Sequence, residues 1–149
     1  IKNNTITGIG IYGFSANSAQ RFICTPKDQS GFTAEIMNNT FYNCYSGGNN
    51  CIDNNSASGD SGTIKIENNI FAVFSGAKGP RIGNNAGCTF DNNCVSSGWS
   101  AGTIAGTNLL SEDPGFTDYT TGPVPANADF TPGNSNVITR RIGDTRWLP

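Results

Sequence analysis

Histidine is absent from the 149-residue sequence, and charged residues make up only 13% of it. The absence of histidine excludes serine–histidine triads, histidine-ligated zinc and histidine general bases. The net charge of −2 and the lack of a long basic run argue against a nucleic-acid partner. No apolar run approaches the ~20 residues that a membrane-spanning helix needs, so we expect no membrane span.

The sequence contains only five cysteines, an odd number. Because five cysteines cannot all pair with one another, at least one is free or pairs outside the chain. Cys44 and Cys51 flank a Gly-Gly pair and could close a loop disulfide in an oxidising compartment. Cys88 and Cys94 are expected to be small core residues. No Cys-x-x-Cys motif is present, which argues against a zinc or thioredoxin-type site.

What the sequence does contain is a repeated hexapeptide: an apolar residue, any residue, Asn-Asn, any residue and an apolar residue. Its four copies are Ile1–Ile6, Ile36–Phe41, Ile66–Phe71 and Phe90–Val95. The Asn-Asn pairs start 35, 30 and 24 residues apart. Periods of about 20 to 50 residues are typical of solenoids.

A weaker series supports this interpretation. Ile52–Asn55 and Ile82–Asn85 each follow a main copy by 16 residues, which predicts two strand-and-turn units in each coil. Around the main copies the residues alternate as in strands, with Ile64 and Ile66 on one face and Lys65 on the other. Few two-residue hairpin signals are present, so we predict an all-β parallel β-helix rather than a sandwich.

The Asn-Asn pairs have a physical role at the bend after each strand. Asn tolerates the left-handed conformation and can hydrogen-bond to its neighbouring backbone. Stacked from coil to coil, the side-chain amides form a ladder. A structural ladder is the simpler interpretation, and an array that orders sugars or water is the alternative.

The outward residues of stacked copies become neighbours ~4.8 Å apart. Lys65 then lies beside Glu35, and Glu67 lies beside Asp91. The second pair is unfavourable unless it is solvated, protonated or bridged by a cation. The ordinary interpretation of this face is a solvated surface with a weak Lys65–Glu35 ion pair.

The repeat pattern ends after residue 99. We therefore divide the chain into coils over residues 1–106 and a C-terminal cap over residues 107–149. The cap is expected to be largely irregular and to wrap back along the body, because a solenoid needs its last coil covered. Trp147 is expected to pin this tail by burying ~200 Å², rather than to bind a ligand together with Arg146.

Several motifs together resemble a known class of proteins. They are the Asn-Asn repeats, Asp113–Phe116, Asp129-Phe130 and the ending Ile142–Trp147. These resemble the C-terminal part of right-handed parallel β-helix proteins of the pectate-lyase-like superfold. In particular they resemble an uncharacterised family of exported bacterial proteins, often associated with glycan utilisation, that end in Ile-Gly-Asp-Pro-Arg-Trp. Thr145 stands here in place of that proline. The resemblance implies a right-handed β-helix and an extracellular, periplasmic or cell-surface location, but no reaction.

The superfold also suggests a chemistry. Its polysaccharide lyases use a lysine or arginine base with carboxylates that hold calcium, an ion that takes about six to eight oxygen ligands. Lys65, Lys78 and Arg81 are the candidate bases, and Glu67 and Asp91 are the candidate calcium ligands. The predicted face lacks the usual cluster of three or more carboxylates, so we expect no cofactor, with calcium as the alternative.

Polysaccharide binding or scaffolding without catalysis is the function we expect. Tyr45 and Trp99 lie in Gly/Ser-rich surroundings and are candidate sugar-binding residues, since an aromatic ring packs on sugar C–H groups. One alternative is a polysaccharide lyase or glycosidase whose active site is partly missing from this chain. Another is an adhesin-like domain that stacks through its N-terminal edge. Because Ile1 lies inside a repeat, we expect further repeats or domains before it in the parent protein.

Overall fold

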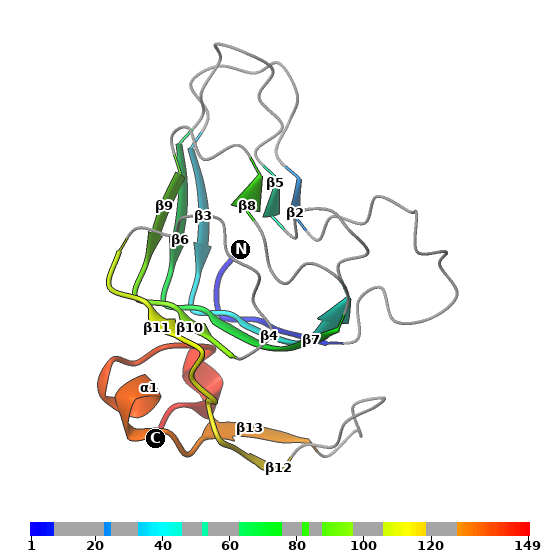
Figure 1. Cartoon of the computed structure of the whole chain (residues 1–149), viewed down its shortest axis with the longest axis vertical. Helices are drawn as coiled ribbons and strands as arrows, with labels where there is room; N and C mark the ends of the chain where they lie inside the picture. The colour runs from blue at the N-terminus through cyan, green and yellow to red at the C-terminus, as the bar shows by residue number, and fades with distance from the viewer. Residues whose placement is uncertain are drawn as a thin grey trace.

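The computed structural model describes residues 1–7, 23–24, 33–45, 52–53, 63–75, 82–83, 88–96, 106–118 and 128–149. Within these ranges the fold is all-β, with three parallel sheets, one antiparallel strand pair and two short helical segments (Figure 1). The predicted all-β class and the parallel pairing of the repeats are confirmed.

The first parallel sheet contains the strands that precede the Asn-Asn pairs. In sheet order these are β3 (Thr33–Met37), β6 (Thr63–Glu67) and β9 (Cys88–Asp91). Ile36, Ile66 and Phe90 are in register and buried, whereas Lys65, which precedes Ile66 in β6, is exposed. The predicted alternation of apolar and polar faces is therefore confirmed.

The second parallel sheet contains the strands that follow the Asn-Asn pairs. In sheet order these are β1 (Thr5–Thr7), β4 (Thr40–Tyr45), β7 (Ile70–Ser75), β10 (Cys94–Val95) and β11 (Leu109–Leu110). Phe41 stacks on Phe71 with ring centroids 4.9 Å apart, and Phe71 stacks on Phe90 at 5.9 Å. This aromatic stack and the buried isoleucines of the first sheet form the inner core.

The third parallel sheet contains three two-residue strands, β2 (Ile23–Cys24), β5 (Ile52–Asp53) and β8 (Ile82–Gly83). Their isoleucines are in register. Each complete repeat therefore has three strands, as in β3, β4 and β5, and the prediction of two strand-and-turn units per coil is wrong. The cause is the Asn-Asn bend. The sequence pattern indicates one strand followed by a turn, whereas the structure has one strand before the bend and another after it.

The first Asn of each pair makes this bend. Asn3, Asn38, Asn68 and Asn92 have φ angles of 56°, 55°, 58° and 49°, all in the left-handed region that asparagine tolerates. Figure 1 shows that the first and second sheets meet at a corner, and these residues lie between the strands on its two sides, as Asn38 lies between β3 and β4. The left-handed turn predicted from the Asn-Asn pairs is confirmed.

The second Asn of each pair forms the predicted ladder. Asn39 donates from Nδ2 to Asn69 Oδ1 at 2.9 Å, and Asn69 donates in the same way to Asn93 at 3.0 Å. All three side chains are fully buried. Asn4 extends the ladder at one end and Asn108 at the other, with distances of 3.2 and 3.0 Å.

Asn108 was not predicted, because its copy of the repeat is incomplete. Thr107 stands where the other copies have their first Asn, and Asn108 follows Asn93 by only 15 residues. Gly106, with a φ of +112°, supplies the positive backbone angle near this turn. A Cβ on Gly106 would lie 2.3 Å from the carbonyl oxygen of Phe90, so the close approach of the two backbones requires glycine here.

The C-terminal segment has more regular structure than the irregular cap predicted for residues 107–149. Its elements after β11 are β12 (Phe116–Asp118), β13 (Asp129–Pro132), α1 (Ser135–Thr139) and the 3-10 helix η1 (Thr145–Trp147). β12 and β13 pair antiparallel. The alternation of half-buried and buried residues along β13 and the Asn134 cap of α1 produce this order.

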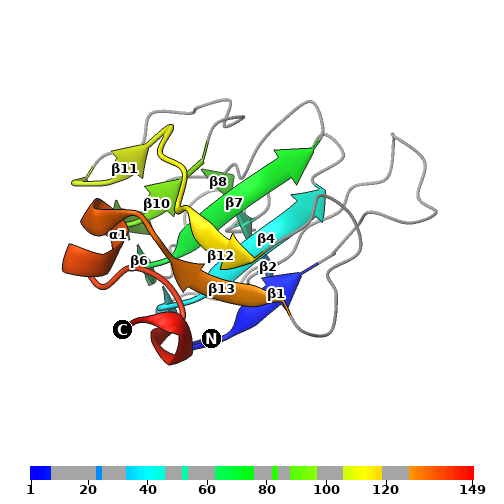
Figure 2. The same ribbon diagram turned by 90° about the horizontal axis from the view of Figure 1, so that it is seen from below.

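This segment packs against the second sheet, as Figures 1 and 2 show from two directions. An outer core forms between them, in which Tyr42, Ile70 and Cys94 of the sheet meet Phe116 and Phe130. Phe130 lies 5.3 Å from Tyr42 and 5.3 Å from Phe116, in edge-to-face contacts. β11 continues the second sheet just beyond residue 106, where the predicted boundary between coils and cap was placed.

Candidate functional site

The outward side chains of β3, β6 and β9 form what we call the outer face. Glu35, Lys65 and Thr89 are in register across the three strands, and so are Met37, Glu67 and Asp91. The predicted adjacency of Lys65 to Glu35 and of Glu67 to Asp91 is thus confirmed as strand register. Lys65 and Thr89 are exposed, while Glu35 and Glu67 are half-buried.

Glu35 forms its ion pair with Lys2 rather than with Lys65. Lys2 bridges to Met37 on the neighbouring strand, and its Nζ lies 2.5 Å from Glu35 Oε2. The hydrogen bond and the charge of Lys2 lower the pKa of Glu35, and the charge of Lys65 contributes further. Lys65 therefore acts on Glu35 only through its field, and no ion pair of Lys65 occurs within the described residues.

Asp91 is held by the loop that follows it. Its Oδ1 accepts hydrogen bonds from Thr107 N at 2.7 Å, Thr107 Oγ1 at 2.8 Å and Asn92 N at 3.0 Å. These bonds, the backbone N–H of Thr107 foremost, lower the pKa of Asp91, and the charge of Arg140 assists. Arg140 in turn donates to the carbonyl of Thr107. Asp91 therefore stabilises the turn at Thr107 through these hydrogen bonds. Of the two predicted calcium ligands, Glu67 is the one with fewer contacts of this kind among the described residues.

The other predicted site residues are covered unevenly by the structure. Lys78, Arg81 and Trp99 lie outside the described residues, and only the backbone of Tyr45 is described, at the end of β4. The predicted Cys44–Cys51 disulfide involves Cys51, which also lies outside them. In the described part of the chain no three or more His, Cys, Asp or Glu side chains converge on a common point.

Cys94 is a free, fully buried thiol of the outer core, as predicted. Burial raises the pKa of the Cys94 thiol to about 12, and the charges of Glu112 and Asp113 act in the same direction. The thiol lies 3.6 Å from the carbonyl oxygen of Glu112, to which it donates. Because a thiol is nucleophilic only when ionised, Cys94 is a packing residue and not a reactive one.

The last turn of the chain forms a second polar site, which we call the clasp and define as residues 140–147. It crosses successive rungs of the second sheet, a rung being one level of stacked strands. Four of its hydrogen bonds each reach a different repeat: Asn92 Nδ2 to Arg140 O at 3.2 Å, Gly143 N to Asn68 O at 2.7 Å, Asp144 N to Thr40 Oγ1 at 3.2 Å and Thr145 Oγ1 to Asn3 Oδ1 at 3.2 Å. The clasp thereby ties four repeats together.

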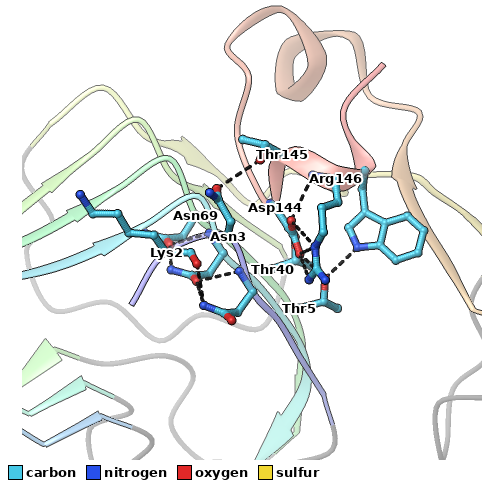
Figure 3. A network of polar contacts seen from close by, with 11 residues as sticks. Lys2, Asn3, Thr5, Thr40, Asn69, Asp144, Thr145 and Arg146 are labelled. Atoms are coloured by element: carbon cyan, nitrogen blue, oxygen red, sulfur yellow. Dashed lines mark hydrogen bonds and ion pairs between the residues drawn. The ribbon is translucent and has the colours of Figure 1, made fainter.

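Asp144 is the centre of the clasp (Figure 3). Its side chain is fully buried, and its Oδ2 lies 2.5 Å from Arg146 and accepts from Thr5 Oγ1 at 2.8 Å. Burial alone raises the pKa of Asp144, but the hydrogen bonds from Arg146 and Thr5 outweigh it, so the pKa lies below its ordinary value. Asp144 is thus a paired, ionised carboxylate whose partners come from both ends of the chain.

Trp147 packs as predicted. Its indole Nε1 donates to Thr5 Oγ1 at 2.7 Å, and its ring lies 5.8 Å from that of Phe130. Arg146 binds Asp144, which agrees with the structural role expected for this pair of residues. A signal was available in the sequence, because Thr5 and Thr40 are polar where the next copy of the repeat has Ile70.

The family model described as "Domain of unknown function (DUF5123)" matches residues 34–147. No curated protein and no solved structure matches the chain. Among the helices in the described ranges, none is long and apolar enough to cross a membrane.

Proposed function

Because the chain belongs to the DUF5123 family, whose function is unknown, we propose a function from its own residues: it is a polysaccharide-binding scaffold without a catalytic centre. The proposed architecture is a right-handed parallel β-helix of the pectate-lyase-like superfold. The ordered repetition of strands in three parallel sheets supports this architecture. The proposed setting is outside the cell, in the periplasm or on the cell surface, as the sequence resemblance implies.

One observation carries the binding proposal: Lys65 and Glu67 project from the same face of β6, two residues apart, outside any described ion pair. The neighbouring carboxylates already have partners in the fold: Glu35 forms an ion pair with Lys2, and Asp91 accepts hydrogen bonds from Thr107. Lys65 can donate three hydrogen bonds and Glu67 can accept several, and sugar hydroxyls satisfy both. Exposed Thr63 and Thr89 add hydroxyl groups beside them.

The same geometry favours binding over catalysis. A lyase of this superfold would need a base beside a calcium held by several carboxylates. Glu67 has Asp91 as its neighbour, and one oxygen of Asp91 already accepts three hydrogen bonds. We therefore propose that Lys65 and Glu67 contact sugar hydroxyls directly, with Tyr45 and Trp99 as further candidate contacts.

The test is affinity electrophoresis and glycan-array binding of the wild-type chain and of the double variant Lys65→Ala/Glu67→Gln. We expect the double variant to bind at least about tenfold more weakly, since it loses two polar contacts. The control is Arg141→Asn, which removes one exposed charge in the clasp and keeps a residue that tolerates its φ of 53°.

Two results would overturn the proposal. Unchanged binding by the double variant would show that the outer face does not bind the polysaccharide, and Tyr45→Ala and Trp99→Ala would then test these two residues as contacts. Cleavage of a polysaccharide with formation of unsaturated chain ends, dependent on calcium and on Lys65, would replace the scaffold by a lyase.

A further inference from the structure

The N-terminal edge of the second sheet repeats the geometry of every later rung. In each interior rung, the ladder Asn accepts two hydrogen bonds at Oδ1 from the Asn one rung earlier. Asn69 Oδ1 accepts from Asn39 N at 3.0 Å and from Asn39 Nδ2 at 2.9 Å. Asn108 Oδ1 accepts from Asn93 in the same way, at 2.9 and 3.0 Å.

Asn4 has the orientation of an interior rung although no described rung precedes it. It donates from N and from Nδ2 to Asn39 Oδ1 at 3.1 and 3.2 Å, and from Nδ2 to Lys2 O at 2.8 Å. Among the described residues nothing donates to Asn4 Oδ1. This oxygen therefore occupies the position at which interior rungs receive two hydrogen bonds.

The backbone N–H next to Asn4, that of Thr5, likewise has no partner among the described residues. In the four later rungs, the residue after the ladder Asn donates its N–H to the carbonyl of the preceding ladder Asn, and each of these bonds is 2.8 Å long. The donors are Thr40, Ile70, Cys94 and Leu109. Thr5 is in register with Thr40, and no described residue accepts from the Thr5 N–H. An edge strand with an unpaired donor and acceptor is a template for another strand.

We propose that this edge binds, as one further parallel strand, a separate peptide segment of the pattern apolar-x-Asn-Asn-x-apolar. The second Asn of that segment donates from N and Nδ2 to Asn4 Oδ1, and its carbonyl accepts from Thr5 N–H. Its last apolar residue lies over Ile6. Aspartate cannot replace this Asn, because a carboxylate has no N–H to donate and would face the oxygen of Asn4.

The test is titration of the ¹⁵N-labelled chain with a synthetic peptide that carries the sequence of residues 33–42. We expect hydrogen exchange of the Thr5 amide to slow by about tenfold or more at saturation, and the peptide with Asp in place of its second Asn to bind about tenfold more weakly. Asn4→Ala should weaken binding of the unmodified peptide, whereas Asn136→Ala, at an exposed position of α1, should not.

Equal protection by the two peptides, or none, would overturn the proposal. Protection of the Thr5 amide in the free chain that increases with protein concentration would instead assign the edge to a second copy of this chain. The outcome is separable from glycan binding, because Lys65→Ala/Glu67→Gln lies on the outer face and should leave peptide binding unchanged.

Discussion

Thr5 donates its hydroxyl hydrogen to Asp144 across 139 positions of sequence, over 2.8 Å. The same Thr5 oxygen accepts from Trp147 Nε1 at 2.7 Å. The clasp is therefore anchored on the first described strand, and it holds the outer core between the second sheet and β13. The stability of the domain should depend on this contact far more than the exposure of the last residues suggests.

Arg146 should contribute to stability although its side chain is 64% exposed. Its removal leaves the fully buried carboxylate of Asp144 without its charged partner, and an unpaired buried charge destabilises a fold. We expect Arg146→Met, which keeps the apolar stem, to lower the free energy of unfolding in urea denaturation by clearly more than the matched control does. The matched control, Arg141→Asn in the same segment, should change it by less than about 1 kcal/mol.

The position of Asn in the ladder should decide the cost of its removal. Asn69 is fully buried and exchanges hydrogen bonds with Asn39, Asn93 and the carbonyl of Ile36. Asn69→Ala leaves several of these groups unsatisfied at about 1–3 kcal/mol each, so we expect a loss of about 3–5 kcal/mol or failure to fold. Asn4→Ala, at the exposed end, should cost about 1 kcal/mol. Thermal and urea unfolding measure both variants. If Asn69→Ala and Asn4→Ala lost the same unfolding free energy, the proposed contribution of the ladder would be contradicted.

These two sites differ in how far the sequence reveals them. The turn role of the first Asn and the ladder role of the second Asn in each pair are predictable, because identical dipeptides recur at the same place in each repeat. The register of Glu67 beside Asp91 follows from the same alignment. Local periodicity of this kind specifies which backbones stack, and the inner core follows from it.

The clasp is not predictable in the same way. Asp144 meets Thr5 and Thr40 through a tertiary contact that has no period, so the ending of the chain indicates a structural tail without showing what it binds. Lys2 reaches Glu35 because of side-chain length, which strand register does not determine. Asp91 accepts hydrogen bonds from Thr107. This contact could not be predicted, because the repeat that contains Thr107 lacks the Asn-Asn pair.

Gly143 should tolerate no side chain. Its φ is +108°, and a Cβ there would lie 2.6 Å from Cδ1 of Ile70 in the outer core. We expect Gly143→Ala to cost about 2–3 kcal/mol, because backbone strain and overpacking act together. Gly115→Ala is the matched control: its φ is +63° and the nearest atom to a new Cβ is 3.4 Å away, so about 1 kcal/mol is expected. Thermal unfolding compares the two variants. Equal shifts of their melting temperatures would show that the Ile70 side chain moves to accommodate the new methyl group.

Acid should destabilise the domain through its paired carboxylates. The pKa values of Glu35, Asp91, Asp129 and Asp144 are all lowered in the folded chain, Asp144 by hydrogen bonds that overcome its burial. A lowered folded-state pKa means that the unfolded chain binds protons first as the pH falls. The stabilisation is therefore complete above the ordinary carboxyl range and is lost as the pH drops from about 4 towards the folded-state values.

The share of Asp144 in this acid response can be isolated with Asp144→Asn. The variant should be less stable than the wild type at neutral pH, since it loses the charge-assisted bonds to Arg146. As the pH falls below about 4, Asp144 of the wild type takes up a proton in the unfolded chain before it does so in the folded chain, so the difference in the free energy of unfolding should shrink. Urea denaturation of both chains from about pH 7 to about pH 3 measures this difference. A constant difference over that range would mean that Asp144 does not titrate with a lowered pKa.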